Sequence, residues 1–300
     1  MSDTKPLKTA LDFIDYGHSL LQESEVYYGH GTDNAWDEIV SLVLATLEFP
    51  DDVPQMYLEQ ALNDYQCAQL KKNINLRISK RLPLAYITNQ ILFAGIEFYI
   101  DERALIPRSP MAELIEQHFA PWFTEPPKSI LDLCTGGGCI ALACAAYMPE
   151  AMVDGVDIST DALAIAEINR QHLELIDRVQ FYESDLYSAI ENKRYDLIVT
   201  NPPYVDAEDM AALPSEYHHE PELALASGHD GLDCTHHILK HAADYLNENG
   251  ILILEVGNSA QALEAAYPDV TFTWLAFARG GDGVCLLDRA QLVNIANARI

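Results

Sequence analysis

The stretch that decides the fold of this chain is Ser129-Ile130-Leu131-Asp132-Leu133-Cys134-Thr135-Gly136-Gly137-Gly138-Cys139-Ile140-Ala141-Leu142-Ala143-Cys144-Ala145-Ala146. Its apolar first part, residues 129–133, predicts a short buried strand. The three glycines predict a tight loop, and the small residues after them predict a helix. A strand, a glycine loop and a helix in this order are typical of nucleotide-binding α/β folds, because the loop lets the backbone approach a ligand closely.

Three more predicted strands follow, at residues 152–157, 180–185 and 195–200, and each ends in or just before a polar side chain. Carboxyl ends of parallel strands meet at one edge of an open α/β sheet, which is where ligands bind. We therefore expect Asp132, Asp157, Asp185 and Asn201 to lie near one another at that edge.

The cofactor is not decided by the glycine loop alone. Residues 136–141 also fit a relaxed dinucleotide fingerprint, so a nicotinamide enzyme would begin in a similar way. Asp157 lies about twenty residues past the loop, where an acceptor for a ribose hydroxyl is expected. Acidic strand ends suit an uncharged adenosine joined to a cationic sulfonium and would repel a pyrophosphate. This favours S-adenosyl-L-methionine, with Asp132 near its amine, Asp157 on its ribose and Asp185 near its adenine.

The tetrapeptide Asn201-Pro202-Pro203-Tyr204 follows the last of these strands. A nitrogen conjugated to a carbonyl or a ring is a poor nucleophile, so an enzyme that alkylates it must accept its N–H hydrogens and orient its lone pair. Asn201 offers a side-chain carbonyl for this, and the prolines stiffen the turn and free main-chain carbonyls. Tyr204 can lie flat against a planar group. The tetrapeptide predicts a clamp for an amide or amino nitrogen; in isolation it would more often be a turn that ends a strand.

With these motifs the chain resembles the class I S-adenosylmethionine-dependent methyltransferases, and within them the HemK-like protein-glutamine N5-methyltransferases. The resemblance runs from about residue 81 to residue 285. Members that modify release factors typically carry Pro-Arg-Pro, whereas this chain has Pro107-Arg108-Ser109-Pro110. That variant, together with Asp132-Leu133-Cys134-Thr135-Gly136, is similar to the PrmB branch, whose substrate is a glutamine of the third protein of the large ribosomal subunit.

The resemblance implies an α/β class I (Rossmann-like) fold with a seven-stranded, mostly parallel sheet and a small N-terminal helical domain. It implies S-adenosyl-L-methionine as the methyl donor and S-adenosyl-L-homocysteine as the product. The expected catalytic residues are Asn201, Pro202, Pro203 and Tyr204. The expected cofactor-binding residues are Asp132, Cys134, Thr135, Gly136, Gly137, Gly138, Asp157, Ile158, Asp185, Leu186 and Asn201.

More specific expectations concern Cys134 and, outside these sets, Arg108. The general class I loop has glycine where Cys134 stands, so we expect a negative φ there and a less direct contact with the ligand. Arg108 is expected to meet a carboxylate of the cofactor or of neighbouring chain, or to form a surface ion pair.

The expected reaction is an in-line displacement in which the glutamine amide nitrogen attacks the sulfonium methyl group. Most of the catalysis would come from positioning and from acceptors that match the charge growing on nitrogen. The Asn201 side chain and the Pro202 carbonyl would accept the two N–H groups while Tyr204 packs on the amide plane. The residues call for neither a metal nor a separate strong base.

Charge narrows the class of partner. The chain has 46 acidic and 18 basic side chains and a formal net charge of −28. Such a chain is repelled by the phosphates of naked nucleic acid, whereas a strongly basic protein, such as a ribosomal protein before or during assembly, would be attracted. Solubility or habitat could equally account for the acidic surface. No run approaches a membrane span, and the first residues lack an export signal.

The six cysteines form no Cys-x-x-Cys pair, which favours reduced thiols in a cytoplasmic protein over a disulfide framework or a zinc site.

Three regions are expected along the chain. Residues 1–82 show apolar side chains at helical spacing, with Asn34 as a helix cap, and predict a helical domain for substrate recognition. Residues 83–108 predict a linker with a β-hairpin that pairs 93–100 with 104–107 around a turn at 101–103. Residues 109–300 predict the methyltransferase domain. Within it, 206–233 predict a lid over cofactor and substrate, and 270–275 with 284–287 predict a last, antiparallel pair of strands.

Several functions compete at this stage. A release factor methyltransferase would also methylate a glutamine amide nitrogen, but in a peptide chain release factor. An adenine-N6 nucleic-acid methyltransferase would use the same clamp on a flipped base, but the excess of acidic residues argues against it. A non-catalytic ribosome assembly factor would keep the cofactor pocket, and the intact Asn201–Tyr204 tetrapeptide argues weakly against that.

Overall fold

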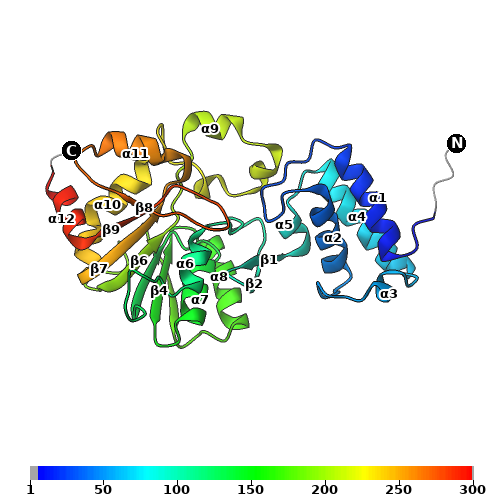
Figure 1. Ribbon diagram of the computed structural model, residues 1–300, viewed down its shortest axis with the longest axis horizontal. Helices are drawn as coiled ribbons and strands as arrows, with labels where there is room; N and C mark the ends of the chain where they lie inside the picture. Colours follow the sequence, from blue (N-terminus) through cyan, green and yellow to red (C-terminus); the bar gives the residue numbers. More distant parts are fainter. Residues whose placement is uncertain (1–5, 299–300) are drawn as a thin grey trace. The chain divides into compact units, whose positions relative to one another are not determined.

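The computed structural model describes residues 6–298 of the chain. It contains two compact units, shown as ribbons in Figure 1. The first unit comprises Met1–Gln90 together with Pro214–His219, and the second comprises Ile91–Leu213 together with Glu220–Ile300. The sequence gives no hint that the short segment Pro214–His219, far along the chain, belongs to the first unit.

The first unit is helical, as its apolar spacing predicts. Its helices are α1 (Ala10–Gln22), α2 (Ala35–Thr46), α3 (Gln55–Leu58), α4 (Asp64–Ser79) and α5 (Leu84–Thr88). Phe13, Ile39, Leu42 and Leu70 are completely buried at its centre. Asn34 caps α2 as expected, because its side chain accepts hydrogen bonds from the first backbone N–H groups of the helix.

Buried charges hold the segment Pro214–His219 in the first unit. The Glu216 side chain is completely buried and accepts hydrogen bonds from Arg77 Nη1 at 3.2 Å, from Arg81 Nε at 2.6 Å and from the Tyr27 backbone N–H at 2.9 Å. Burial alone would raise the pKa of Glu216, but these donors hold the pKa below its ordinary value. An ion pair this well satisfied fixes the position of the segment, because separating it would leave charges buried without partners.

A seven-stranded sheet forms the centre of the second unit. Its strand order is β5-β4-β3-β6-β7-β9-β8. The strands are β3 (Ser129–Leu133), β4 (Met152–Asp157), β5 (Val179–Glu183), β6 (Tyr195–Thr200), β7 (Leu246–Glu255), β8 (Thr273–Trp274) and β9 (Val284–Asp288). The first five in spatial order are parallel, and β9 is antiparallel to both of its neighbours, β7 and the edge strand β8. This arrangement confirms the predicted class I methyltransferase fold.

Helices cover both faces of this sheet (Figure 1). They are α6 (Met111–Glu116), α7 (Cys139–Tyr147), α8 (Thr160–His172), α10 (Asp233–Tyr245), α11 (Ala260–Ala266) and α12 (Arg289–Asn297). Helix α9 (Ala207–Ala212) has no buried residue and belongs to neither apolar core. One apolar core contains side chains of α6 and α7, and the other contains side chains of α10, α11 and α12. Strands buried on both faces read as continuous apolar runs, which is why residues 129–133 and 195–200 were recognisable in the sequence.

The topology of the sheet predicts where a ligand would bind. From β3 the chain moves outward through β4 and β5 and then returns to β6 on the other side of β3. Neighbouring crossovers therefore diverge where β3 and β6 end. In open α/β sheets this switch point is where ligands bind.

The β-hairpin differs from the prediction. It pairs β1 (Gln90–Phe93) with β2 (Ile96–Tyr99), so the predicted pairing of 93–100 with 104–107 is wrong. Residues 101–103 do form a turn, in which the Ala104 N–H donates to the Asp101 carbonyl at 3.1 Å, but this turn joins no strands. The turn residues of the hairpin are Ala94 and Gly95, and both have positive φ, 48° and 70°, as a tight two-residue hairpin turn requires. Instead of pairing in a sheet, the Ile106 backbone N–H donates to the Glu220 carboxylate at 3.1 Å.

Among the helices of residues 6–298, none combines the length and the apolar character needed to cross a membrane.

Candidate active site

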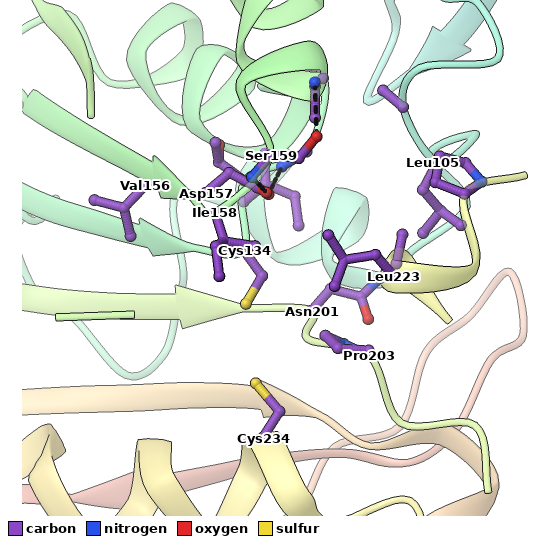
Figure 2. Close-up of a pocket in the computed structure, with 18 of the residues that line it drawn as sticks. Leu105, Cys134, Val156, Asp157, Ile158, Ser159, Asn201, Pro203, Leu223 and Cys234 are labelled. Atoms are coloured by element: carbon purple, nitrogen blue, oxygen red, sulfur yellow. Dashed lines mark hydrogen bonds between the residues drawn. The ribbon is translucent and has the colours of Figure 1, made fainter. Parts of the chain in front are cut away.

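A cavity of about 370 Å³ lies in the second unit at the carboxyl ends of β3, β4 and β6 (Figure 2). Its volume lies within the range of small-molecule sites. Most of the residues expected from the sequence border it. They are Cys134, Thr135, Gly136, Gly137, Asp157, Ile158, Asp185, Leu186, Asn201 and Pro203.

Four expected residues, Asp132, Gly138, Pro202 and Tyr204, do not border the cavity. Asp132 is completely buried beneath the glycine loop. Its Oδ2 accepts hydrogen bonds from Thr135 Oγ1 at 2.5 Å and from the Ala141 backbone N–H at 3.0 Å, while Oδ1 has no partner among the described residues. Burial raises the pKa of Asp132 to about 7. Its contact with the amine of the cofactor stays a prediction; what the structure shows is a brace between the loop and α7.

Positive φ angles shape the glycine loop. Gly138, the residue that precedes α7, has φ 81°, and a Cβ placed there would lie 2.9 Å from Ala166 Cβ and 2.9 Å from Phe181 Cζ. Cys134 has φ 57°, so the expected negative φ at this position is wrong. The left-handed conformation lets the backbone leave β3 sharply, so that the Thr135 N–H reaches the Val156 carbonyl at 2.9 Å. Cys134 therefore borders the cavity although it carries a Cβ that glycine would lack.

Asp157 ties the end of β4 to the glycine loop (Figure 2). Its Oδ2 accepts from the Gly136 N–H at 2.8 Å, and its Oδ1 accepts from the Ser159 N–H at 2.9 Å. Burial raises the pKa of Asp157, and these backbone donors counteract part of that effect. Each carboxylate oxygen retains a second lone pair, which can accept from a hydroxyl in the cavity.

Asp185 also borders the cavity, two residues past the end of β5. Within residues 6–298 its carboxylate makes no hydrogen bond. It is therefore free to accept from an amino group of a ligand.

Asn201 follows β6 and lies across the cavity from Asp157, with Pro203 beside it (Figure 2). In the described part of the chain, the Asn201 side-chain amide has no hydrogen-bond partner. An amide that faces a cavity without an internal partner can accept hydrogen bonds from a substrate.

Tyr204 is oriented by contacts outside the cavity. Its hydroxyl donates to Glu255 Oε1 at 3.2 Å, and its backbone carbonyl accepts from Ser259 Oγ at 2.8 Å. The ring therefore has a fixed attachment at the end of β7, next to the strand that delivers Asn201.

Arg108 does not keep a free charge for a ligand. Its two terminal nitrogens lie 2.7 and 3.0 Å from the two carboxylate oxygens of Glu220, whose side chain is completely buried. The surface ion pair considered from the sequence is thus a bidentate pair with a buried acid.

Sequence reasoning missed several residues around the site. Glu255 directly follows the apolar run 251–254, which is the same pattern that revealed Asp157, so it could have been found. Leu105, Leu223 and Cys234 border the cavity from loops and from the first turn of α10. No sequence pattern marks them, because their places depend on how distant segments meet.

Comparisons with known proteins agree with this geometry. The family model of the methyltransferase small domain matches residues 113–216. Two bacterial proteins described as ribosomal protein uL3 glutamine methyltransferase are each 46% identical to this chain. The one from Francisella tularensis subsp. tularensis covers 97% of this chain and 94% of its own length, and the one from Neisseria gonorrhoeae covers 96% of each.

Among solved structures, the catalytic domain of hMettl16, in complex with the MAT2A 3'UTR hairpin 6, matches with a TM-score of 0.51 and 15% identity. The match covers 82% of this chain and 91% of that chain. At this identity the likeness concerns the fold alone.

Proposed function

The chain belongs to the family of ribosomal protein uL3 glutamine methyltransferases, and we propose that it methylates the side-chain amide nitrogen of one glutamine in uL3, the third protein of the large ribosomal subunit. The observation that carries the proposal is that the unpartnered Asn201 amide borders the same cavity as Asp157 and Asp185. A group that can hold an amide substrate thus shares one cavity with acids suited to a cationic nucleoside.

The cavity fits S-adenosyl-L-methionine, the methyl donor of such enzymes. Two arginines border it, but Arg103 is paired with Asp101 and Arg108 with Glu220. The acids Asp157 and Asp185 are therefore left to interact with a cation and with neutral ribose and adenine groups. When bound, the cofactor supplies an electrophilic methyl group.

The clamp would act on the glutamine amide in three ways. The Asn201 side-chain oxygen and the Pro202 carbonyl would accept its two N–H hydrogens, which leaves the nitrogen lone pair to face the methyl group. Pro203 would keep the turn stiff. The Tyr204 ring would pack on the amide plane. Such positioning, together with acceptors that match the charge growing on nitrogen, can supply a large part of the rate enhancement.

Electrostatics support a basic protein as the partner rather than naked nucleic acid or a membrane. The net charge of −28 would attract a cationic ribosomal protein, and the chain would be repelled by phosphates. We also propose the cytoplasm as the place of action, since ribosomal proteins are made there.

We assign substrate recognition to the helical N-terminal region, residues 1–82. Aromatic side chains on it are exposed, among them Trp36 at 48% and Tyr65 at 72%. For the region 206–233 we propose the role of a lid, supported by Pro221, Leu223 and Ala224 at the border of the cavity.

The test is methyl transfer from radiolabelled S-adenosyl-L-methionine to purified uL3, a release factor and duplex DNA in parallel reactions. Label on uL3 alone is expected. Label on the release factor would reject uL3 as the substrate and keep glutamine methylation. Label on DNA alone would show that the substrate is not a protein.

A further inference from the structure

Three polar side chains from distant parts of the second unit meet at the end of β7. Glu255 Oε2 accepts a hydrogen bond from Ser109 Oγ at 2.5 Å, and Glu255 Oε1 accepts one from the Tyr204 hydroxyl at 3.2 Å. Both oxygens of one carboxylate are thus engaged by a loop residue and by the last residue of the Asn201–Tyr204 tetrapeptide.

Glu255 is buried, with an exposed fraction of 5%, and both of its carboxylate oxygens are engaged by Ser109 and Tyr204. Burial raises the pKa of Glu255, although the hydrogen bonds from Ser109 and Tyr204 and the charge of Arg108 counteract this. A buried acid with two side-chain donors is suited to hold those donors in place.

Two glycines lie against Tyr204, Gly257 beside its ring and Gly231 beside its backbone carbonyl. A Cβ on Gly257, which has φ 46°, would lie 2.6 Å from Tyr204 Cε2, so this residue must stay small for the ring to fit. A Cβ on Gly231 would lie 2.2 Å from the Tyr204 carbonyl oxygen, which also accepts from Ser259 Oγ. The ring therefore packs closely against Gly257 along one edge, and its hydroxyl is bonded to Glu255.

Ser109 is itself held in place. Its Oγ accepts from the Met111 backbone N–H at 3.2 Å while it donates to Glu255, and its exposed fraction is 6%. The preceding residue, Arg108, is fixed by its bidentate pair with Glu220. The loop can therefore act as a rigid support for the Glu255 carboxylate.

We propose that Glu255 is a positioning residue for methyl transfer, which orients the Tyr204 ring against the plane of the substrate amide, and that Ser109 orients Glu255. The inference rests on the proposed function, because it gives Tyr204 its role in the clamp. Glu255 acts only through the Tyr204 hydroxyl, so its effect must disappear when that hydroxyl is absent.

A double-mutant cycle tests this dependence. The variants are Glu255→Ala, Tyr204→Phe and the two combined, assayed by steady-state methyl transfer to uL3. We expect Glu255→Ala to lower kcat about 10-fold with KM changed less than about 2-fold, and to have less than about a 2-fold effect in the Tyr204→Phe background. Glu255→Gln keeps an oxygen acceptor for the hydroxyl, so it should retain kcat within about 3-fold.

The controls separate positioning from folding. Glu248→Ala removes an exposed acid of the same strand and should leave kcat unchanged. Ser109→Ala should lower kcat, measured at saturating cofactor because Ser109 borders the cavity, in the same direction as Glu255→Ala, with a melting temperature close to wild type. Additive effects in the cycle, a Glu255→Ala variant with wild-type kcat, or a Gln variant as impaired as the Ala variant would each overturn the proposal.

A second readout needs no substrate. In protein labelled with ¹³C at tyrosine Cζ, the Tyr204 signal is identified by its loss in Tyr204→Phe. We expect it to shift in Glu255→Ala and in Ser109→Ala and to stay in place in Glu248→Ala. An unmoved signal would contradict the positioning role even if uL3 is methylated. A moved signal with no methylation of uL3 would support the contact and reject the proposed substrate.

Discussion

Two turns at neighbouring strand ends are built in different ways. The glycine loop after β3 is held by acids that lie near it in the sequence: Asp132 binds Thr135 and the Ala141 N–H, and Asp157 binds the Gly136 N–H. The turn after β6 that carries Asn201 and Tyr204 is held by residues more than fifty positions away, among them Glu255. Both turns border or adjoin one cavity.

This difference suggests that the first turn serves the binding of the cofactor and the second serves methyl transfer. The glycine loop is largely preformed by its own backbone donors, so damage to it should weaken the binding of the cofactor. Among residues 6–298 the Asn201 side chain has no partner, so its loss should spare the binding of the cofactor and strongly lower turnover. Each substitution below is chosen to affect one turn and to leave the other intact.

The largest effect is expected at the second turn. Asn201→Ala removes an acceptor that matters most as charge grows on the amide nitrogen, so kcat should fall roughly 10²- to 10³-fold, as when one preorganised hydrogen-bonding group is lost. The dissociation constant of S-adenosyl-L-homocysteine, measured by calorimetry, should change less than about 2-fold. Asn249→Ala, at an exposed position of β7, is the matched control. Equal losses in affinity and kcat would contradict a clamp that is separate from the cofactor site.

At the first turn, the buried acid Asp132 should make stability depend on pH. Its folded pKa is raised from 3.8 to about 7. Its protonated form is therefore favoured in the folded protein, and this contribution to stability is complete below pH 3.8 and is lost as the pH rises through 7. At about 1.4 kcal/mol per pH unit, wild-type protein without ligand should lose roughly 2–3 kcal/mol more than Asp132→Asn between pH 5 and pH 7.

Urea denaturation at the two pH values measures this difference in the free energy of unfolding. Asp161→Asn, at an exposed position of α8, should follow the wild type. If Asp132→Asn showed the same pH dependence as the wild type, Asp132 would not be the titrating group.

The next effect concerns affinity. Asp157→Ala removes two charge-assisted hydrogen bonds that shape the glycine loop, so the affinity for S-adenosyl-L-homocysteine should fall roughly 30-fold, or about 2 kcal/mol. At saturating cofactor, kcat should recover to within about 3-fold of wild type. The exposed Asp161→Ala serves as the control in the same titration. An unchanged affinity would show that the loop does not need Asp157.

The smallest expected effect is on the free energy of unfolding, and it measures how tightly Gly138 is packed. Gly138 and Gly280 both have positive φ, 81° and 87°, but a Cβ at Gly138 meets Ala166 and Phe181 at 2.9 Å, whereas at Gly280 nothing lies within 4 Å. Both alanine variants lose the conformational advantage of glycine. Gly138→Ala should therefore unfold with a free energy about 1–2 kcal/mol lower than Gly280→Ala. Equal melting curves would show that the loop yields to the extra methyl group.

The sequence predicted what depends on local pattern. Apolar runs gave the strands, the glycines gave the loop, and polar strand ends gave Asp157, Asp185 and Asn201. The β-hairpin was misplaced because its turn, Ala94-Gly95, carries a weaker signal than the polar 101–103. Cys134 was given the wrong φ because the Thr135–Val156 backbone bond that requires the turn depends on the register between two strands.

Contacts between residues far apart in the sequence could not be predicted either, because they depend on the fold. Glu216 belongs to the first unit through ion pairs with arginines more than 130 positions away. Ser109 and Glu255 are separated by 146 positions. Such pairs follow from packing and leave no periodic trace in a single sequence, so the support of the second turn is visible only in the fold.

The central claim is that the Asn201–Tyr204 clamp presents an amide nitrogen to the methyl donor. The most direct measurement is tandem mass spectrometry of uL3 after reaction with wild-type protein and with Asn201→Ala. We predict one methyl group on the side-chain nitrogen of a single glutamine with the wild type, and, at equal enzyme and short equal reaction time, a yield roughly 10²- to 10³-fold lower with the variant. A methyl group on a lysine, a carboxylate or the backbone, or an unchanged yield with Asn201→Ala, would contradict the claim.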